Sequence, residues 1–149
     1  MHRDSSLAVF PTNPESCCHR LKRQGGFADK ESMVSNSQKR VLIVDDEPII
    51  CQTLKMILRY DGHRAETVCG GAEAVAAVEA GSYDMVFLDY QMPGMTGDKV
   101  ARVIKSKAPQ SPIVFVTGHL PRPKSPDVEL VIEKPFTVEN IRAAMTRAA

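Results

Sequence analysis

Five short strand-like runs, most of them strongly apolar, are spaced along the chain after residue 40. When helical patterns separate such runs, they are typical of buried parallel strands, because helices cover both faces of a parallel sheet. The alternation therefore predicts a doubly wound α/β fold with a five-stranded parallel sheet, whose simplest strand order is 2-1-3-4-5. The right-handed rule for crossover connections leaves few other topologies. The expected strands are residues 41–44, 64–68, 85–88, 112–117 and 128–133.

Four segments between or after these runs have helical spacing. The clearest of them repeats apolar residues at Ile50, Leu54 and Leu58. The preceding Asp-Glu-Pro of residues 46–48 is typical of a helix start, and Asp61–Gly62 is typical of a helix end. The expected helices are residues 47–60, 72–80, 97–107 and 137–147.

The bulk composition indicates one globular domain and excludes several functions. At 149 residues the chain can bury a sizeable core, and its 43% hydrophobic and 25% charged residues are ordinary for a soluble protein. A net charge of +1 favours neither nucleic acid nor a membrane surface, and no apolar stretch reaches the ~20 residues of a transmembrane helix. The four cysteines fit no zinc pattern and favour reduced thiols in the cytoplasm.

Residues 1–38 differ in composition from the rest of the chain. They mix Ser, Pro, Asn, Gly, Lys and Arg without a sustained period, which predicts a disordered leader before a domain at 39–149. Met33 stands shortly before the first strand, where a translation start would leave a short leader. Residues 1–32 are therefore either a flexible tail or the product of an upstream start site, and both explanations stay open.

Polar residues follow four of the predicted strands at the points where these strands end. Ligands of such sheets bind beyond the carboxyl ends of the strands, so these residues are expected to meet at one edge. Taken singly, each has a plainer explanation, such as a helix cap for an aspartate or a solvated loop charge for the lysine. Together, three carboxylates, an ammonium and a hydroxyl suit a divalent cation beside a phosphoryl group. These residues are Asp45 and Asp46, then Asp89, Thr117 and Lys134.

The phrases LIVDDEP, LDYQMPGMTG, FVTG and EKPF occur in this order within residues 40–148. Together they resemble the receiver domain of bacterial response regulators, which has a flavodoxin-like fold. The resemblance implies that Asp89 is the phosphoacceptor, that Thr117 is the switch hydroxyl, and that Lys134 contacts the phosphoryl group. It also implies a Mg²⁺ site made by Asp45, Asp46, Asp89 and the backbone carbonyl of Gln91.

Electrostatics gives these roles an independent reason. Without a metal, Asp89 would attack a negatively charged phosphorus centre from within an acidic cluster, so repulsion would dominate. Mg²⁺ and Lys134 reverse this field, and phosphoryl transfer then depends mainly on positioning and charge neutralisation. A cis bond is expected at Lys134–Pro135, which would direct the lysine to the site; for X–Pro the cis form costs only about 0.5–1 kcal/mol.

The stretch 118–127, GHLPRPKSPD, is shorter than its counterpart in the family. It contains three prolines, and a proline in a helix interior costs about 3 kcal/mol, so the fourth helix of the family is predicted to be missing. His119, two residues after Thr117, is a candidate for the mouth of the site. With no helix in this stretch, we expect phosphorylation to change the order of the 118–127 loop.

The fifth predicted strand also departs from the family. Val131 stands where receivers usually carry an aromatic switch residue. By alternation, Val128, Leu130 and Ile132 should point to one face, and Glu129, Val131 and Glu133 to the other. Two glutamates on the face that the missing helix would cover predict a wet face or a partner there.

Three functions compete. The leading prediction is a stand-alone phosphoacceptor switch that receives a phosphoryl group from a histidine kinase or histidine phosphotransfer protein and acts on an unidentified downstream protein. Such a protein is not an enzyme beyond its own phosphorylation and dephosphorylation, and no nucleic acid or membrane partner is expected, while dimerisation stays open. The second is a pseudo-receiver scaffold with little phosphorylation. The third, a Mg²⁺-dependent phosphohydrolase, is disfavoured because Tyr90, Gln91 and Met92 supply no second carboxylate after Asp89.

Overall fold

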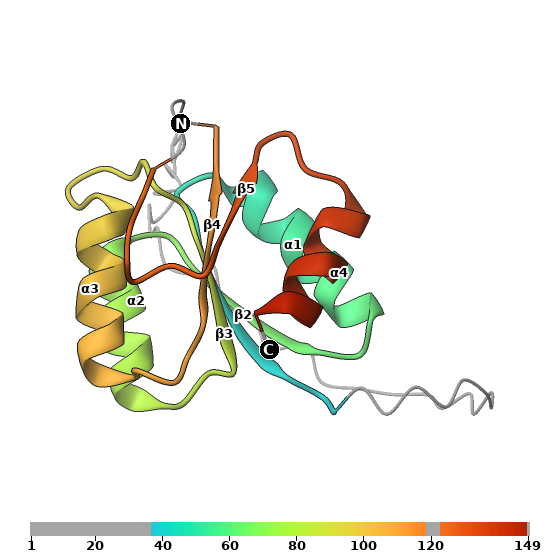
Figure 1. Cartoon of the computed structure of the whole chain (residues 1–149). Helices are drawn as coiled ribbons and strands as arrows, with labels where there is room; N and C mark the ends of the chain where they lie inside the picture. Colours follow the sequence, from blue (N-terminus) through green and yellow to red (C-terminus); the bar gives the residue numbers. More distant parts are fainter. Residues whose placement is uncertain (1–36, 119–122, 149) are drawn as a thin grey trace, which may run out of the picture. The chain divides into compact units, whose positions relative to one another are not determined.

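The computed structural model describes residues 37–118 and 123–148. Five strands and four helices form within these residues (Figure 1), and most ends lie within one residue of the predicted ones. The strands are β1 (Arg40–Val44), β2 (Arg64–Val68), β3 (Met85–Leu88), β4 (Ile113–Thr117) and β5 (Leu130–Glu133). The helices are α1 (Pro48–Tyr60), α2 (Gly71–Ala80), α3 (Gly97–Lys107) and α4 (Val138–Arg147). The predicted leader, apart from its last two residues, lies outside the described residues.

The strands form one parallel sheet in the order β2-β1-β3-β4-β5, which confirms the predicted fold. The register aligns the carboxyl ends of neighbouring strands. Val44 at the end of β1 pairs with Leu88 at the end of β3, and Thr117 at the end of β4 pairs with Glu133 at the end of β5. Residues that follow these strands therefore start from the same edge of the sheet.

Two helices cover each face of the sheet, with α1 and α4 on one side and α2 and α3 on the other (Figure 1). Alternation along β1 divides the core between the two faces. Val41 and Ile43 pack toward α1 and α4, whereas Leu42 and Val44 pack toward α2 and α3, and all four are buried. This double coverage explains the continuous apolar runs of β1, β3 and β4.

Local signals fix where the helices begin and end. Pro48 occupies the first turn of α1, where a missing backbone N–H costs nothing, and Gly62 follows the helix with a φ of +87° that favours glycine. Thr137 and Asn140 form a capping box at the start of α4. Within residues 37–118 and 123–148, none of the helices combines the length and the apolar character needed to cross a membrane.

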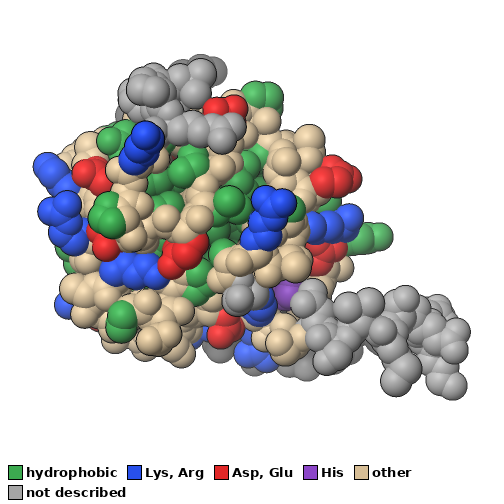
Figure 2. Space-filling view, in the orientation of Figure 1, with side chains coloured by type: hydrophobic (Ala, Val, Ile, Leu, Met, Phe, Trp, Pro, Cys, Tyr) green, Lys and Arg blue, Asp and Glu red, His purple; other side chains and the backbone are tan. Residues whose placement is uncertain are grey.

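The described part of the connection between β4 and β5 contains no helix, as the prolines predicted. Val131 is half-buried, pairs with Phe115 in the sheet and packs against the core cluster on the α2–α3 side. A hollow of about 620 Å³ lies beside it, lined by residues 123–126 and 128–131. The space-filling view, in the orientation of Figure 1, shows hydrophobic side chains in the middle of the molecule, with charged side chains around them (Figure 2). Residues 119–122, which include His119, lie outside the description.

The expected start and alternation of the fifth strand were wrong. The strand begins at Leu130, and Val128 packs on the α2–α3 side, because a turn bond from its N–H to the Ser125 oxygen precedes the strand and breaks the alternation. The predicted wet face or partner stays a prediction, and Glu129 is exposed there. Its carboxylate accepts hydrogen bonds of 2.6 Å from both the Lys105 ammonium and the Ile113 N–H, so this acid secures the start of β4.

Candidate functional site

Three aspartates meet at the carboxyl edge of the sheet. Asp45 and Asp46 follow β1 and Asp89 follows β3, and each offers a carboxylate oxygen within 4.8 Å of the others. Asp45 and Asp89 are only 2% and 5% exposed, whereas Asp46 is open to solvent. Crowding of this kind is costly unless a cation shares the oxygens.

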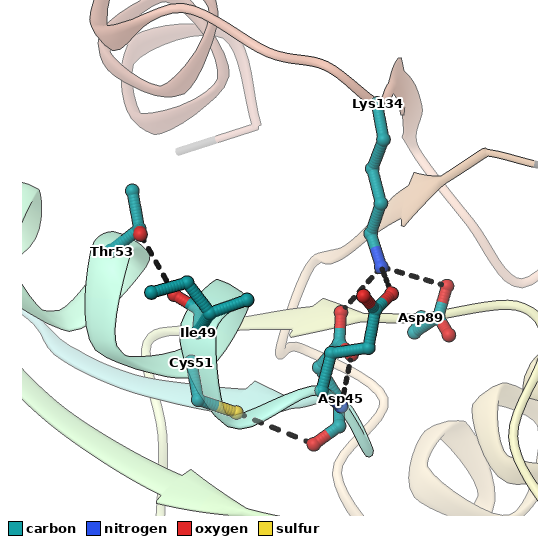
Figure 3. Close-up of polar contacts among 7 residues, drawn as sticks. Asp45, Ile49, Cys51, Thr53, Asp89 and Lys134 are labelled. Carbon is teal, nitrogen blue, oxygen red and sulfur yellow. Dashed lines mark hydrogen bonds and ion pairs between the residues drawn. The ribbon is translucent and has the colours of Figure 1, made fainter.

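Lys134 enters the same cluster from the end of β5 (Figure 3). Its Nζ donates hydrogen bonds to Asp45 Oδ2 at 2.8 Å and to Glu47 Oε1 at 3.1 Å, and it lies 3.6 Å from Asp89 Oδ1. The peptide bond between Lys134 and Pro135 is cis, as predicted. One ammonium thus pairs with three carboxylates, so the cluster keeps an excess of negative charge.

The pKa values of the cluster express this excess. Burial raises the pKa of Asp89 to about 6, and the charges of Asp45 and Asp46 add to the rise while Lys134 opposes it. Burial also raises the pKa of Asp45, even though Lys134 donates a hydrogen bond to it. Burial alone would lower the pKa of Lys134, but its hydrogen bonds to Asp45 and Glu47 prevail and raise that pKa, so the lysine stays charged.

The donor set fits Mg²⁺ chemically. Mg²⁺ prefers hard oxygen ligands and is commonly held by one or two carboxylates together with waters and phosphate oxygens. The three aspartates supply such oxygens in one group, and the pKa values of Asp45 and Asp89 are raised, chiefly by burial and also by neighbouring negative charge. A divalent cation would offset that negative charge.

The roles expected of Thr117 and Gln91 stay predictions. Thr117 is the last residue of β4 and is buried, and its backbone oxygen accepts a hydrogen bond of 2.9 Å from the Lys134 N–H. Gln91 is exposed, two residues after Asp89. The predicted site residues come from the ends of four strands. The oxygens of Asp45, Asp46 and Asp89 lie within reach of one another, and Lys134 pairs with Asp45 and Asp89.

Two glycines shape the loop after Asp89. Gly94 has a φ of +85°, which other residues rarely adopt. Gly97 opens α3 and donates its N–H to the Tyr90 oxygen at 2.8 Å. A Cβ atom at Gly97 would lie 2.6 Å from the Asp89 backbone oxygen, so only glycine lets α3 approach the loop this closely. Gly94 and Gly97 thus shape the loop that follows Asp89.

Sequence reasoning missed the part that Glu47 plays. It treated this residue as a helix-start signal, but the Glu47 side chain makes no capping hydrogen bond and pairs with Lys134 instead. The sequence feature that could have indicated this role is that Glu47 is the third consecutive acidic residue after β1. Cys51 of α1 is buried, and its thiol donates a hydrogen bond to the Asp45 backbone oxygen at 3.3 Å (Figure 3).

Helix α1 also carries an apolar stripe that the sequence analysis did not single out. Ile49, Met56 and Tyr60 are 69%, 70% and 86% exposed. Their spacing of seven and four residues places them on one side of the helix, away from the buried Leu54 and Leu58. The stripe starts two residues after Glu47, at the border of the acidic cluster.

Comparison with known proteins gives the same family over nearly the whole domain. The family model of the response regulator receiver domain matches residues 41–146. The chain is 33% identical over 122 residues to the DNA-binding response regulator MtrA of Mycolicibacterium smegmatis, covering 74% of this chain and 52% of MtrA. It is 38% identical over 79 residues to the transcriptional regulatory protein TcrA of Mycobacterium tuberculosis, covering 53% and 31%. The chain therefore spans about a third to a half of these curated relatives.

Solved structures agree. The response regulator TrrA of Thermotoga maritima, in complex with Mg²⁺-BeF, has a TM-score of 0.70 and 30% identity, covering 75% of this chain and 100% of TrrA. TrrA in complex with the histidine kinase ThkA has a TM-score of 0.68 and 32% identity, covering 74% of this chain and 98% of TrrA.

Proposed function

The chain belongs to the response regulator receiver domain family, and we propose that it is a phosphoacceptor switch that takes a phosphoryl group on Asp89. The donor would be a histidine kinase or a histidine phosphotransfer protein. The observation that carries this proposal is the cluster of three aspartates with Lys134 at the carboxyl edge of the sheet. Receiver domains are signalling domains and are generally not classed as enzymes, and the reaction proposed here changes only the chain itself.

In this proposal the carboxylates of Asp45, Asp46 and Asp89, together with the Gln91 backbone carbonyl, hold Mg²⁺. When bound, the metal supplies positive charge beside the phosphoryl oxygens. The complex of TrrA with Mg²⁺-BeF supports such a site in a relative. Thr117 is proposed as the hydroxyl that senses the phosphoryl group.

Asp89 acts as the nucleophile. An oxygen of its ionised carboxylate forms the new bond to phosphorus while the bond from phosphorus to the donor breaks. Burial raises the pKa of Asp89 to about 6 in the metal-free chain, so at acidic pH the carboxyl group must lose its proton before it can act as the nucleophile. The charged Lys134 ammonium lies 3.6 Å from Asp89 Oδ1, where it can pair with an oxygen of the transferred phosphoryl group.

The donor protein is proposed to dock on the exposed apolar stripe of α1, formed by Ile49, Met56 and Tyr60. The stripe borders the acidic cluster, so a partner that covers it would place a phosphohistidine beside Asp89. The structure of TrrA with the histidine kinase ThkA supports a kinase partner. The downstream partner, a cytoplasmic location and dimerisation stay open predictions.

Intact mass after incubation with a small phosphodonor such as acetyl phosphate tests the proposal. Wild type with Mg²⁺ should gain the mass of one phosphoryl group, and chelation of Mg²⁺ should suppress the gain. Asp89→Asn should show no gain while keeping the circular dichroism spectrum of wild type. A gain in Asp89→Asn equal to that of wild type would contradict the assignment, and no gain in wild type would favour a pseudo-receiver scaffold.

A further inference from the structure

Lys134 is held in this structure by two carboxylates that are not the phosphoacceptor. Its Nζ is closest to Asp45 at 2.8 Å, next to Glu47 at 3.1 Å and farthest from Asp89 at 3.6 Å. We infer that Glu47 is a positioning residue that holds Lys134 away from Asp89 and so lowers the affinity of the site for a phosphoryl group. This inference rests on the proposed function and goes beyond it by naming a regulating residue.

The carboxylate of Glu47 has no competing structural task at the start of α1. Glu47 occupies the N-cap position, but its side chain makes no capping bond. The backbone oxygen of Glu47 accepts the N–H groups of Ile50 and Cys51 at 3.1 and 3.2 Å, so the helix start is satisfied without the side chain. The side chain can therefore pair with the lysine, and within residues 37–118 and 123–148 its ion pair is with Lys134.

Glu47 is also the partner that Lys134 can release most easily. Its side chain is 56% exposed, whereas that of Asp45 is 2% exposed. Solvent can hydrate the exposed carboxylate when the ammonium leaves, but the buried one would lose its partner in a poorly hydrated place. A phosphoryl group on Asp89 competes for the same ammonium. The ion pair with Glu47 adds to the free energy needed to move Lys134 toward that phosphoryl group.

Glu47→Gln tests this inference because it removes the charge and keeps the size of the side chain. With Mg²⁺ present, the affinity for beryllofluoride, a phosphoryl mimic, should rise roughly two- to five-fold, as expected for loss of a largely exposed ion pair. Glu139→Gln is the matched control, since Glu139 stands in the first turn of α4 and has no pair with Lys134 among the ion pairs of the described residues. Equal affinities in wild type and Glu47→Gln would overturn the inference.

An exposed carboxylate could also repel every anion that approaches, without acting through Lys134. A double-mutant cycle separates the two effects. If Glu47 acts through the lysine, Glu47→Gln should change beryllofluoride affinity in the wild-type background and leave it unchanged in a Lys134→Gln background. A gain of the same size in both backgrounds would show general repulsion and would refute the positioning role.

A crystal structure of metal-free Glu47→Gln decides the geometric part without any phosphoryl chemistry. Relative to wild type crystallised under the same conditions, Lys134 Nζ should lie closer to Asp89 Oδ1, below the present 3.6 Å. An unmoved lysine would overturn the inference. If wild type takes up neither phosphoryl group nor beryllofluoride, the proposed function fails, and the position of the lysine still decides whether Glu47 restrains it.

Discussion

Asp89 illustrates what burial does to a single residue in this molecule. Its carboxyl group is 5% exposed and lies beside Asp45 and Asp46, with Lys134 as the opposing charge. Burial and like charge both disfavour the ionised form, whereas the ordinary solution to a buried carboxylate is a close cation. The metal-free site therefore keeps the proton on Asp89 up to about pH 6, and a metal ion would favour the ionised form at lower pH.

This arrangement makes the stability of the metal-free protein depend on pH. The pKa of Asp89 is raised from 3.8 to about 6, so between these values the folded protein holds a proton that the unfolded chain has lost. Stability should therefore fall as pH rises through this window and stay low above it, by at most about 3 kcal/mol. Between pH 5 and 7, wild type should lose roughly 1–2 kcal/mol more than Asp89→Asn.

Urea denaturation in a chelating buffer at the two pH values measures this difference. The comparison with Asp89→Asn removes the contribution of other groups, such as the buried His63, whose pKa burial lowers. Parallel pH profiles of wild type and Asp89→Asn would show that Asp89 ionises normally. Saturating Mg²⁺ should shrink the penalty of wild type at pH 7, because the ion binds the ionised carboxylates.

Asp46 should matter to the metal more than to the fold. It is exposed, so Asp46→Ala removes one anionic ligand without leaving a buried charge unpaired. We expect a Mg²⁺ affinity lowered at least ten-fold, an unperturbed thermal midpoint without metal, and slower phosphorylation at limiting Mg²⁺. Calorimetric titration of Mg²⁺ into both proteins tests this, and equal affinities would give Asp46 another role.

At the scale of elements, the connection from β4 to β5 shows how a strand start can depend on one distant side chain. Ile113 is fully buried, and its N–H is bonded to the Glu129 carboxylate, which also pairs with Lys105 of α3. The carboxylate joins the starts of β4 and β5 to α3. Among the described residues, the connection from β4 to β5 contains no helix that could make this link.

Glu129→Ala should therefore destabilise the domain by about 1–3 kcal/mol, because it leaves the Ile113 N–H without its acceptor. Glu129→Gln is the matched control, since its amide oxygen can still accept from Ile113 N–H while the charge on Lys105 is lost. Its cost should be about 1 kcal/mol or less. Chemical denaturation of the three proteins gives the order, and equal losses in both variants would show that the ion pair dominates.

The same region shows what sequence reasoning can and cannot reach. Its prolines predicted the absence of a helix, because a proline constrains its own backbone wherever it stands. The role of Glu129 could not be predicted, since its partners, Lys105 and the Ile113 N–H, meet it only after the sheet has assembled. Similarly, the strand-end aspartates followed from the apolar runs, but the pairing of Glu47 with Lys134 required the relative placement of α1 and β5.

At the scale of the whole domain, the acidic cluster and the apolar stripe of α1 lie next to each other. The strands deliver Asp45, Asp89 and Lys134 to one edge, and α1 starts from that edge with Ile49 exposed in its first turn. Exposed apolar side chains that line up on one helix, bordering a reactive group, favour a protein donor over a small molecule as the natural phosphoryl source. In the proposed function, a small donor would need only the cluster, whereas a protein donor would also contact the stripe.

This difference gives a prediction that separates docking from chemistry. Met56→Glu places a charge in the middle of the stripe, where the wild-type side chain is 70% exposed, so the fold should tolerate it. Phosphorylation by acetyl phosphate should keep its wild-type rate, whereas transfer from a kinase that phosphorylates wild type in phosphotransfer profiling should slow at least ten-fold, because burying an unpaired charge in an interface is costly. Ala76→Glu is the matched control, since Ala76 is an exposed helical residue on α2, across the sheet from α1. If both variants slow kinase transfer equally, charge rather than docking explains the loss, and if Met56→Glu transfers at the wild-type rate, the donor binds elsewhere on the domain.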